Sequence, residues 1–446
     1  MAASDIVNTD APQRADLDRC VHCGLCLNAC PTYRELGVEM DSPRGRIYQM
    51  VQVANGAPVT PSYEEHIDLC LACRACETAC PSGVQYGRLV EAARADIEQR
   101  TKRPLSTRLL RWAVFSHILP SRFHLRIAGV LLFLYSETGL QKFVRGSGLM
   151  KLMGKLGEAE SLAPTAEPPF FFRNIGRTFP AEGERRYRVA FLAGCMANIC
   201  FARLNEATVR VLQKNGCEVV IPAGQTCCGA LHVHAGIRTT ARKLARQNID
   251  ALLTRKYDAI ITNAAGCGST LKEYGELFEH DPNYADVARR FSAAVKDINE
   301  FLASIDLNPR MGELPLTVTY QDSCHLAHGQ RVRSAPRKLL AAVPGLRLKE
   351  MPMSDLCCGS AGIYNVVHTD MAMSILEKKM RAVNSTGADV IATANPGCIL
   401  QLRAGAALHG KGQRVAHVVE ILDEAYGRGE TKAAEDNRSL TAVLPR

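Results

Sequence analysis

Apolar and polar residues alternate in blocks through the second half of the chain. Short β-branched and apolar runs at 188–192, 218–221 and 259–262 predict buried strands. The segments 205–214, 238–253 and 288–302 have the apolar spacing and the length of helices. Strands that alternate with helices predict a parallel sheet covered by helices on both faces.

This half of the chain also repeats itself weakly. The runs YRVAFLAGC, TCCGA and DAIITNAAGC are matched in order by LTVTYQDSC, LCCGSAG and DVIATANPGC. Corresponding cysteines are 129, 130 and 131 residues apart: Cys195 and Cys324, Cys227 and Cys357, Cys267 and Cys398. The near-constant offset predicts a duplicated α/β domain. The cysteines follow predicted strands, and open α/β sheets bind ligands at the carboxyl ends of their strands, so the two halves could turn their cysteine loops toward each other.

The N-terminal part carries a much more specific pattern. The spacing C-x2-C-x2-C-x3-C-P occurs twice, with cysteines at 20, 23, 26, 30 and at 70, 73, 76, 80. In two-cluster ferredoxins the fourth cysteine of each motif binds the other motif's cluster. The pattern therefore predicts two [4Fe-4S] clusters, the first held by Cys20, Cys23, Cys26 and Cys80 and the second by Cys70, Cys73, Cys76 and Cys30. The alternative is zinc, which prefers ligands in two separated pairs.

Composition supports a globular protein of several domains. The chain has 446 residues, 47% hydrophobic and 22% charged, so its domains need no disulfides and the 18 cysteines call for metal or redox chemistry. We expect a ferredoxin-like helical domain (1–100), a basic apolar helical segment with a proline-containing linker (101–184), and two α/β cysteine-rich domains (185–312 and 313–430). The fold class is thus a multidomain chain that combines α+β and α/β parts.

Positive charge is concentrated in one segment. Residues 101–156 hold ten basic residues and one acid, whereas the whole chain carries +9. No nucleic-acid-binding module accompanies this charge. The most apolar run, 127–135, is too short to span a bilayer. The segment can lie on a membrane surface, or its apolar residues can pack on partner subunits or on the cysteine-rich domains. With no export leader at its start, the chain is expected in the cytoplasm, with peripheral contact to the inner face of the membrane as one option.

Several further residues have two interpretations each. Arg44, Arg46 and Arg74 could offset cluster charge or be solvated surface residues. His232 and His234 follow Cys-Cys-Gly, and we favour hydrogen-bonded residues over ligands. Cys200 and Cys217 have no counterpart in the repeat and are predicted to be core residues.

Each half of the repeat carries four thiols, which we call the first and the second quartet. The first is Cys195, Cys227, Cys228 and Cys267, and the second is Cys324, Cys357, Cys358 and Cys398. They could hold a further iron-sulfur cluster, meet a quinone or a partner thiol, or be retained for packing.

Nearly the whole chain resembles the iron-sulfur subunit of glycolate oxidase (glycolate dehydrogenase). The resemblance rests on PTYRELG, SPRGRIYQM, CRACETACPSGVQYGRLVE, CCGALHVH, AAGCGSTLKEYG and LCCGSAGIYN. It implies an oxidoreductase complex in which flavin-bearing partner subunits oxidise glycolate to glyoxylate and this chain passes electrons to an acceptor, quinone being the favoured one. The chain lacks a G-x-G-x-x-G loop after a strand, so we expect no flavin on it.

One departure leaves other functions open. The similar domains of heterodisulfide reductase end in C-x-x-C, whereas Ala264 and Asn395 stand at the first position of that pair here. The alternatives are a reductase of a disulfide or other small molecule at the cysteine-rich domains, the electron-transfer subunit of a lactate or glycerol-3-phosphate dehydrogenase, and a zinc-bound scaffold.

Overall fold

A helical N-terminal part holds both cysteine motifs. The computed structural model describes residues 10–147, 160 and 164–442. Proline occupies the first turn of three of the helices, where a missing N–H costs nothing, and the Ser42 and Thr60 hydroxyls cap two of them. The elements are α1 (Arg14–Leu17), α2 (Pro31–Leu36), η1 (Glu39–Asp41), α3 (Pro43–Ala54), α4 (Pro61–Asp68), α5 (Ala75–Thr78) and α6 (Tyr86–Arg100).

The first repeat forms a five-stranded sheet with the order β1-β3-β2-β4-β5. Its three central strands match the predicted ones, and all pairs are parallel except that of β1 with β3. The strands are β1 (Thr178–Phe179), β2 (Tyr187–Phe191), β3 (Cys217–Val220), β4 (Ala259–Thr262) and β5 (Val295–Asp297). The helices are α12 (Ala197–Cys200), α13 (Ala202–Lys214), α14 (Ala230–His234), α15 (Arg238–Leu252), α16 (Ala265–Lys272), α17 (Tyr274–Leu277), α18 (Ala285–Ala294) and α19 (Ile298–Ala303).

The single helix predicted over 288–302 is wrong. Helix α18 ends at Ala294, and β5 then pairs with β4 before α19 begins. The Asp297 side chain and Glu300 form a capping box that starts the new helix. Apolar residues continue at helical spacing across this break, so the pattern conceals the edge strand.

The second repeat forms a four-stranded parallel sheet with the order β7-β6-β8-β9. Its strands are β6 (Thr317–Tyr320), β7 (Arg347–Lys349), β8 (Val390–Thr393) and β9 (Arg414–His417). Its helices are η4 (His325–Gly329), α20 (Ser334–Ala341), α21 (Tyr364–Val367), α22 (Thr369–Thr386), α23 (Pro396–His409) and α24 (Val418–Ala442). Because β3-β2-β4-β5 and β7-β6-β8-β9 have the same order, the predicted α/β duplication is confirmed.

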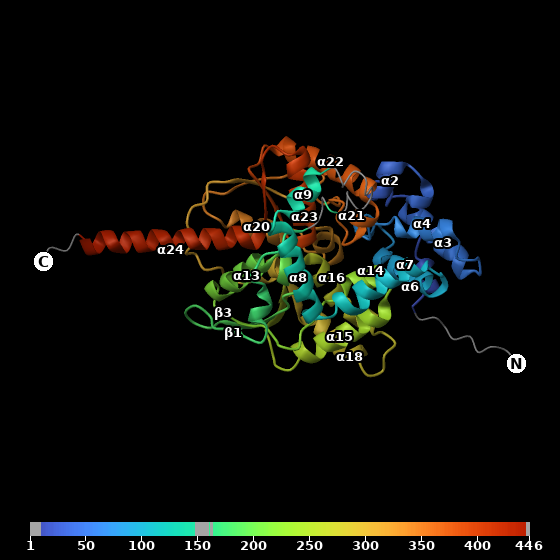
Figure 1. The fold of residues 1–446 in the computed structure, drawn as a ribbon, viewed down its shortest axis with the longest axis horizontal. Coiled ribbons are helices and arrows are strands. Elements are labelled where there is room, and N and C mark those ends of the chain that lie inside the picture. The colour runs from blue at the N-terminus through green and yellow to red at the C-terminus, as the bar shows by residue number, and fades with distance from the viewer. Residues whose placement is uncertain (1–9, 148–159, 161–163, 443–446) are drawn as a thin grey trace.

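Helix α24 crosses back to the first repeat before it runs out of the body of the molecule (Figure 1). The Tyr426 hydroxyl contacts the Asn215 side chain, and Arg210 of α13 pairs with Asp423 at 2.6 Å. The last helix of the second repeat therefore covers a helix of the first.

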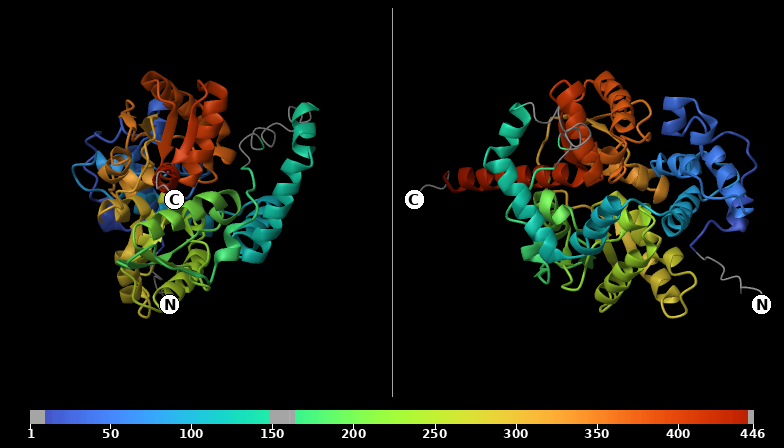
Figure 2. Two further views of the ribbon diagram at one scale, coloured as in Figure 1. Left: turned by 90° about the vertical axis from the view of Figure 1, so that its left-hand side faces the viewer. Right: turned by 45° about the vertical axis from the view of Figure 1, so that its right-hand side comes forward.

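The basic segment forms helices that start beside α6 and continue, with α8 and α9, along a flank away from α2 to α4 (Figure 2). They are α7 (Leu105–Arg111), η2 (Trp112–Ile118), α8 (Arg122–Glu137) and α9 (Leu140–Gly146), followed by η3 (Phe171–Asn174) within the predicted linker. Gly129 lets α8 approach closely, since a Cβ there would lie 2.9 Å from Ile199 and from Phe170. Lys151 and Lys155 of this segment lie outside the described residues.

The outer face of these helices is apolar and exposed. Phe115, Leu119 and Leu125 are buried against the first repeat, whereas Leu109, Trp112, Phe123, Leu131, Leu134 and Phe143 are exposed. In the described part of the chain, no helix alone has the length and apolar character to cross a bilayer; the pair Leu105–Ile118 and Arg122–Glu137, bent by 109°, meets the criterion together.

Candidate iron-sulfur sites

The two N-terminal motifs bend their backbones at equivalent positions. His22 and Gly24 in the first motif, and Ala72 and Arg74 in the second, all have a positive φ. Such left-handed residues turn successive backbone N–H groups toward a common centre. In the second motif the Ala72 N–H donates to the Cys70 sulfur at 3.3 Å. Both loops thus have a shape that wraps around a negatively charged group.

The fourth cysteine of each motif acts on cysteines of the other motif. The Cys80 thiol acts electrostatically on Cys20 of the first motif. Conversely, Cys30 acts on Cys73 and Cys76 of the second motif. These proximities agree with the crossed ligand sets, which stay a prediction, because Cys30 also acts on Cys26 of its own motif and the described residues contain no group of three or more ligand-type side chains gathered closely enough to hold a metal ion.

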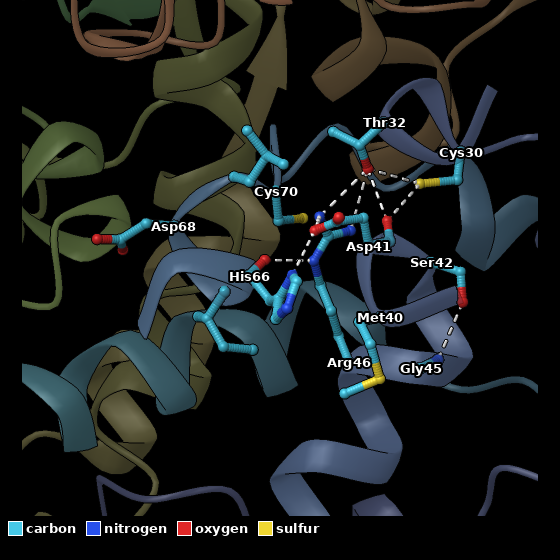
Figure 3. Close-up of polar contacts among 12 residues, drawn as sticks. Cys30, Thr32, Met40, Asp41, Ser42, Gly45, Arg46, His66, Asp68 and Cys70 are labelled. Carbon is cyan, nitrogen blue, oxygen red and sulfur yellow. Dashed lines mark hydrogen bonds and ion pairs between the residues drawn. The ribbon is translucent and has the colours of Figure 1, made fainter. Parts of the chain in front are cut away.

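Arg46 is buried beneath the second set and is not a surface residue (Figure 3). Its guanidinium donates to the His66 carbonyl at 2.6 Å and to the Thr32 hydroxyl at 3.2 Å, and it pairs with Asp41 at 3.4 Å. The Thr32 hydroxyl lies 3.2 Å from the Cys30 sulfur. Burial opposes the charge of Arg46, but the neighbouring Cys70, Tyr86 and Cys30 raise its pKa. A permanent cation next to this cysteine set stabilises negative charge there.

Arg74 ties the second motif to the first repeat. It pairs with Glu77 at 3.0 Å and with Glu273, and it donates to the Ser269 hydroxyl at 3.4 Å. Its side chain is only 15% exposed, so the solvated interpretation is wrong for this residue as well. Arg44 is more accessible and binds the His22 carbonyl and Glu39.

The two quartets gather at the carboxyl ends of their sheets. In the first repeat, Cys227 lies 3.4 Å from Cys195, and contacts between thiols continue through Cys228 to Cys267. In the second repeat the same chain runs from Cys324 through Cys357 and Cys358 to Cys398. Contacts between thiols therefore join all four members in each half.

Asn395 occupies the place of the missing fifth thiol. Its amide nitrogen donates to the Cys398 sulfur at 3.5 Å, and its oxygen accepts from the Gly266 N–H at 3.2 Å. Gly266 adjoins Cys267 of the first quartet, and the Gln330 side chain donates to the Ala265 carbonyl. The cysteine loops of the two halves thus face each other.

The second N-terminal motif lies against the second quartet. Cys73 and Cys357 belong to one buried cluster, and the charge of Cys357 acts on Cys73. The Tyr364 hydroxyl donates to the Leu69 carbonyl at 3.0 Å across the same contact. In contrast, Cys23 of the first motif is exposed, and its neighbours Val21 and Leu25 are 67% and 61% exposed.

The donor sets fit iron-sulfur clusters. All eighteen cysteines are free thiols. Burial raises the pKa of the Cys73 and Cys76 thiols well above the usual value, so they can be thiolates only where a cation, such as cluster iron, compensates their charge. The Tyr86 hydroxyl and the Ala72 N–H, both aimed at the Cys70 sulfur, are the kind of donors that tune cluster potentials.

The remaining residues with two interpretations are resolved. Cys200 and Cys217 are core residues, 3% and 0% exposed. His232 contacts the Phe115 carbonyl at 2.7 Å, and His234 pairs with Glu91, so both histidines have partners in the protein. Sequence reasoning missed Thr32, Asp41 and His325. Of these, His325 alone had a local signal, since it follows a quartet cysteine.

Family models match most of the chain. The "4Fe-4S dicluster domain" matches residues 16–84, and the "Cysteine-rich domain" matches 189–272 and 318–403. Residues 106–163 match the "Glycolate oxidase iron-sulfur subunit, linker region".

Curated relatives cover a similar span. A probable glycolate oxidase iron-sulfur subunit of Bacillus subtilis is 43% identical over 92% of this chain and 94% of its own length. The glycolate oxidase iron-sulfur subunit of Escherichia coli is 35% identical over the same shares. A fumarate reductase (CoM/CoB) subunit of Methanothermobacter marburgensis is 35% identical over 54% of this chain and 46% of its own length.

Proposed function

Because the chain belongs to the family of glycolate oxidase iron-sulfur subunits, we propose that it transfers electrons in a flavin-dependent complex that oxidises glycolate to glyoxylate. The packing of Cys73 into one buried cluster with Cys357 carries this proposal, since it places the second cysteine motif beside a second set of thiols inside the protein. The hydroxy acid reacts on flavin-bearing partner subunits, and no flavin is assigned to this chain.

Two [4Fe-4S] clusters are assigned to the crossed sets. Cys20, Cys23, Cys26 and Cys80 hold one, and Cys70, Cys73, Cys76 and Cys30 hold the other. Each cluster supplies one-electron chemistry without an open coordination site. The quartets are candidate sites for further iron-sulfur groups, and the interactions that link their thiols, with Cys195 and Cys227 3.4 Å apart, favour this over simple packing.

Burial gives the electron path an order. Exposed Cys23, with Val21 and Leu25 beside it, makes the first set the point of exchange with the flavin subunits. The second set is enclosed by protein and touches the second quartet. Electrons therefore pass from the exposed set to the enclosed set and on to the second quartet, toward the acceptor, which we take to be a quinone.

Metal analysis of anaerobically purified protein tests the assignment. Two cubanes require about eight irons and eight acid-labile sulfides per chain, and loaded quartets raise this to about twelve to sixteen. If the second quartet holds iron, replacing Cys357 and Cys358 by serine lowers the count. Cys200→Ala, a core cysteine outside every set, should leave it unchanged. Zinc in place of iron, or iron near zero, would refute the assignment.

With quinone as the acceptor, we expect helices α7 to α9 to contact a membrane surface. Arg108 and Arg126 are exposed beside apolar side chains, whereas Arg111 and Arg122 bind Glu98 and the Ala223 carbonyl. The exposed arginines can therefore reach lipid head groups, while the other two hold the helices on the protein. Helices α8 and α9 lie on another flank from the N-terminal cysteine part (Figure 2), so a membrane there leaves room for the flavin subunits.

Removing these two charges should weaken binding to anionic membranes. Each basic side chain near the surface contributes about 1 kcal/mol, so changing Arg108 and Arg126 to glutamine should lower partitioning roughly 30-fold. Flotation of the complex with anionic and neutral liposomes measures this. Arg289 and Arg381, both exposed elsewhere, provide a matched double glutamine control. Flotation that does not depend on lipid charge or on salt would contradict an electrostatic contact between these arginines and the membrane.

A further inference from the structure

Two histidines from opposite halves of the repeat meet beside the second cysteine motif. The rings of His234, at the end of α14, and His325, at the start of η4, are 5.2 Å apart between centroids and inclined by 74°. His325 Nε2 lies 3.0 Å from the Ala72 carbonyl, in the loop between Cys70 and Cys73. A carbonyl only accepts, so Nε2 carries the hydrogen. His325 Nδ1 is then a lone pair, and it is buried with no hydrogen-bond partner among the described residues.

The chain of contacts continues from His234 to a cavity. His234 Nδ1 is 3.0 Å from Glu91 of α6. Glu91 lines a cavity of about 430 Å³ between the N-terminal part and the first repeat, bordered also by exposed Glu279 and His280. Three side chains therefore connect this cavity with the loop of the second motif.

Charged groups from every neighbouring element surround the Glu91–His234 pair. Burial disfavours ionised Glu91, but the hydrogen bond and charge of His234 lower its pKa. Burial, and next the neighbouring His234, lower the pKa of His325 to about 3, so its ring is neutral. Glu91 is thus a carboxylate that accepts a hydrogen bond from His234 Nδ1. The surrounding groups are Arg74 and Glu77 (α5), Arg94 (α6), Arg238 (α15), Glu273 after α16, Glu276 (α17) and His325 (η4).

We propose that His234, held by Glu91, takes up a proton from the cavity when an electron arrives at the second N-terminal cysteine set. The inference rests on the proposed electron-transfer function. One electron comes from the flavin partner and one proton from water. Because His234 Nδ1–H donates to the Glu91 carboxylate, the proton adds at Nε2 of His234, and the net charge of the buried contact does not change. Both leave when the electron moves on. At short range inside protein, added negative charge stabilises a protonated imidazole strongly. His325 holds His234 next to the second motif by its hydrogen bond to the Ala72 carbonyl.

A redox titration of the whole complex at several pH values, followed by paramagnetic resonance, tests this coupling. Since histidine titrates near pH 6.5, the useful window is about pH 6 to 9. In the wild type the midpoint potential of the second cluster should fall as pH rises. The limiting slope is a tenfold change in equilibrium constant per pH unit, which is 59 mV for one electron.

Variants distinguish the effect of Glu91 and His234 from that of other groups that border the cavity. H234Q can still hydrogen-bond to Glu91 but cannot take the proton, so its potential should become independent of pH. E91Q removes the carboxylate that favours protonated His234, so the dependence should move to lower pH. H280Q, at the exposed border of the same cavity, should behave as the wild type.

The outcomes are distinguishable. A pH-independent potential in the wild type, or a wild-type slope in both H234Q and E91Q, overturns the proton coupling and leaves electron transfer intact. If H234Q loses the second cluster, the pH dependence of the potential in E91Q alone decides whether the proton coupling holds. Absence of any cubane signal from the wild type refutes the proposed function itself and this inference with it.

Discussion

Replacing Cys73 by serine is expected to stop electron transfer through the chain while glycolate still reduces the flavin of the partner subunits. Cys73 is 7% exposed and belongs to the buried cluster that contains Cys357 of the second quartet. Its loss removes a proposed ligand of the second cluster, at the point where the proposed path enters the cysteine-rich domains. Anaerobic stopped-flow should show flavin bleaching at the wild-type rate, and quinone-analogue reduction should fall to background.

A matched substitution controls for damage to the fold. Cys217 is fully buried in β3, outside every predicted ligand set, so Cys217→Ala should keep quinone-analogue reduction. If the complex with Cys73→Ser reduced the quinone analogue with glycolate at the wild-type rate, this chain would not be the electron path.

Replacing Cys80 by serine should disturb both N-terminal clusters and the fold around them. Cys80 is the last cysteine of the second motif but acts on Cys20 of the first, and Cys30 of the first motif acts on Cys76 of the second. Metal binding and folding are linked in small cysteine-rich modules, so losing one crossed ligand loosens both motifs. Even about 2 kcal/mol of lost stability lowers the melting temperature of a domain of this size by roughly 8–16 °C.

Paramagnetic resonance and calorimetry on the same sample measure the two effects together. We expect altered signals from both clusters and earlier unfolding of the N-terminal part. Clean loss of one signal, with the other signal and the melting temperature unchanged, would argue for two independent, uncrossed sites.

Local sequence signals were sufficient for the cysteine motifs and the central strands. The spacing of Cys20 to Cys30 and Cys70 to Cys80 predicts the dicluster domain that the family model matches at 16–84, and β4 coincides with its predicted run at 259–262. These features depend on neighbours within a few residues. The edge strand β5 was missed because Val295 and Ile298 continue the helical spacing on both sides of it.

Features that depend on contacts between distant parts of the chain could not be predicted. Nothing near Arg46 in the sequence shows that it is fully buried against Thr32 and Asp41. The ring contact of His234 with His325 and the approach of Cys73 to Cys357 arise from the docking of three domains. Spacing within one motif carries no information on such docking.

Helix α24 has a consequence for how the protein is made. Tyr426 contacts Asn215, a residue 211 positions earlier in the chain. A ribosome adds about 5 to 20 residues per second, so the α13 surface that α24 covers emerges roughly 10 to 40 s before its partner. During that interval the nascent first repeat displays apolar surface to the cell, and shielding by a chaperone would matter most at this stage of synthesis.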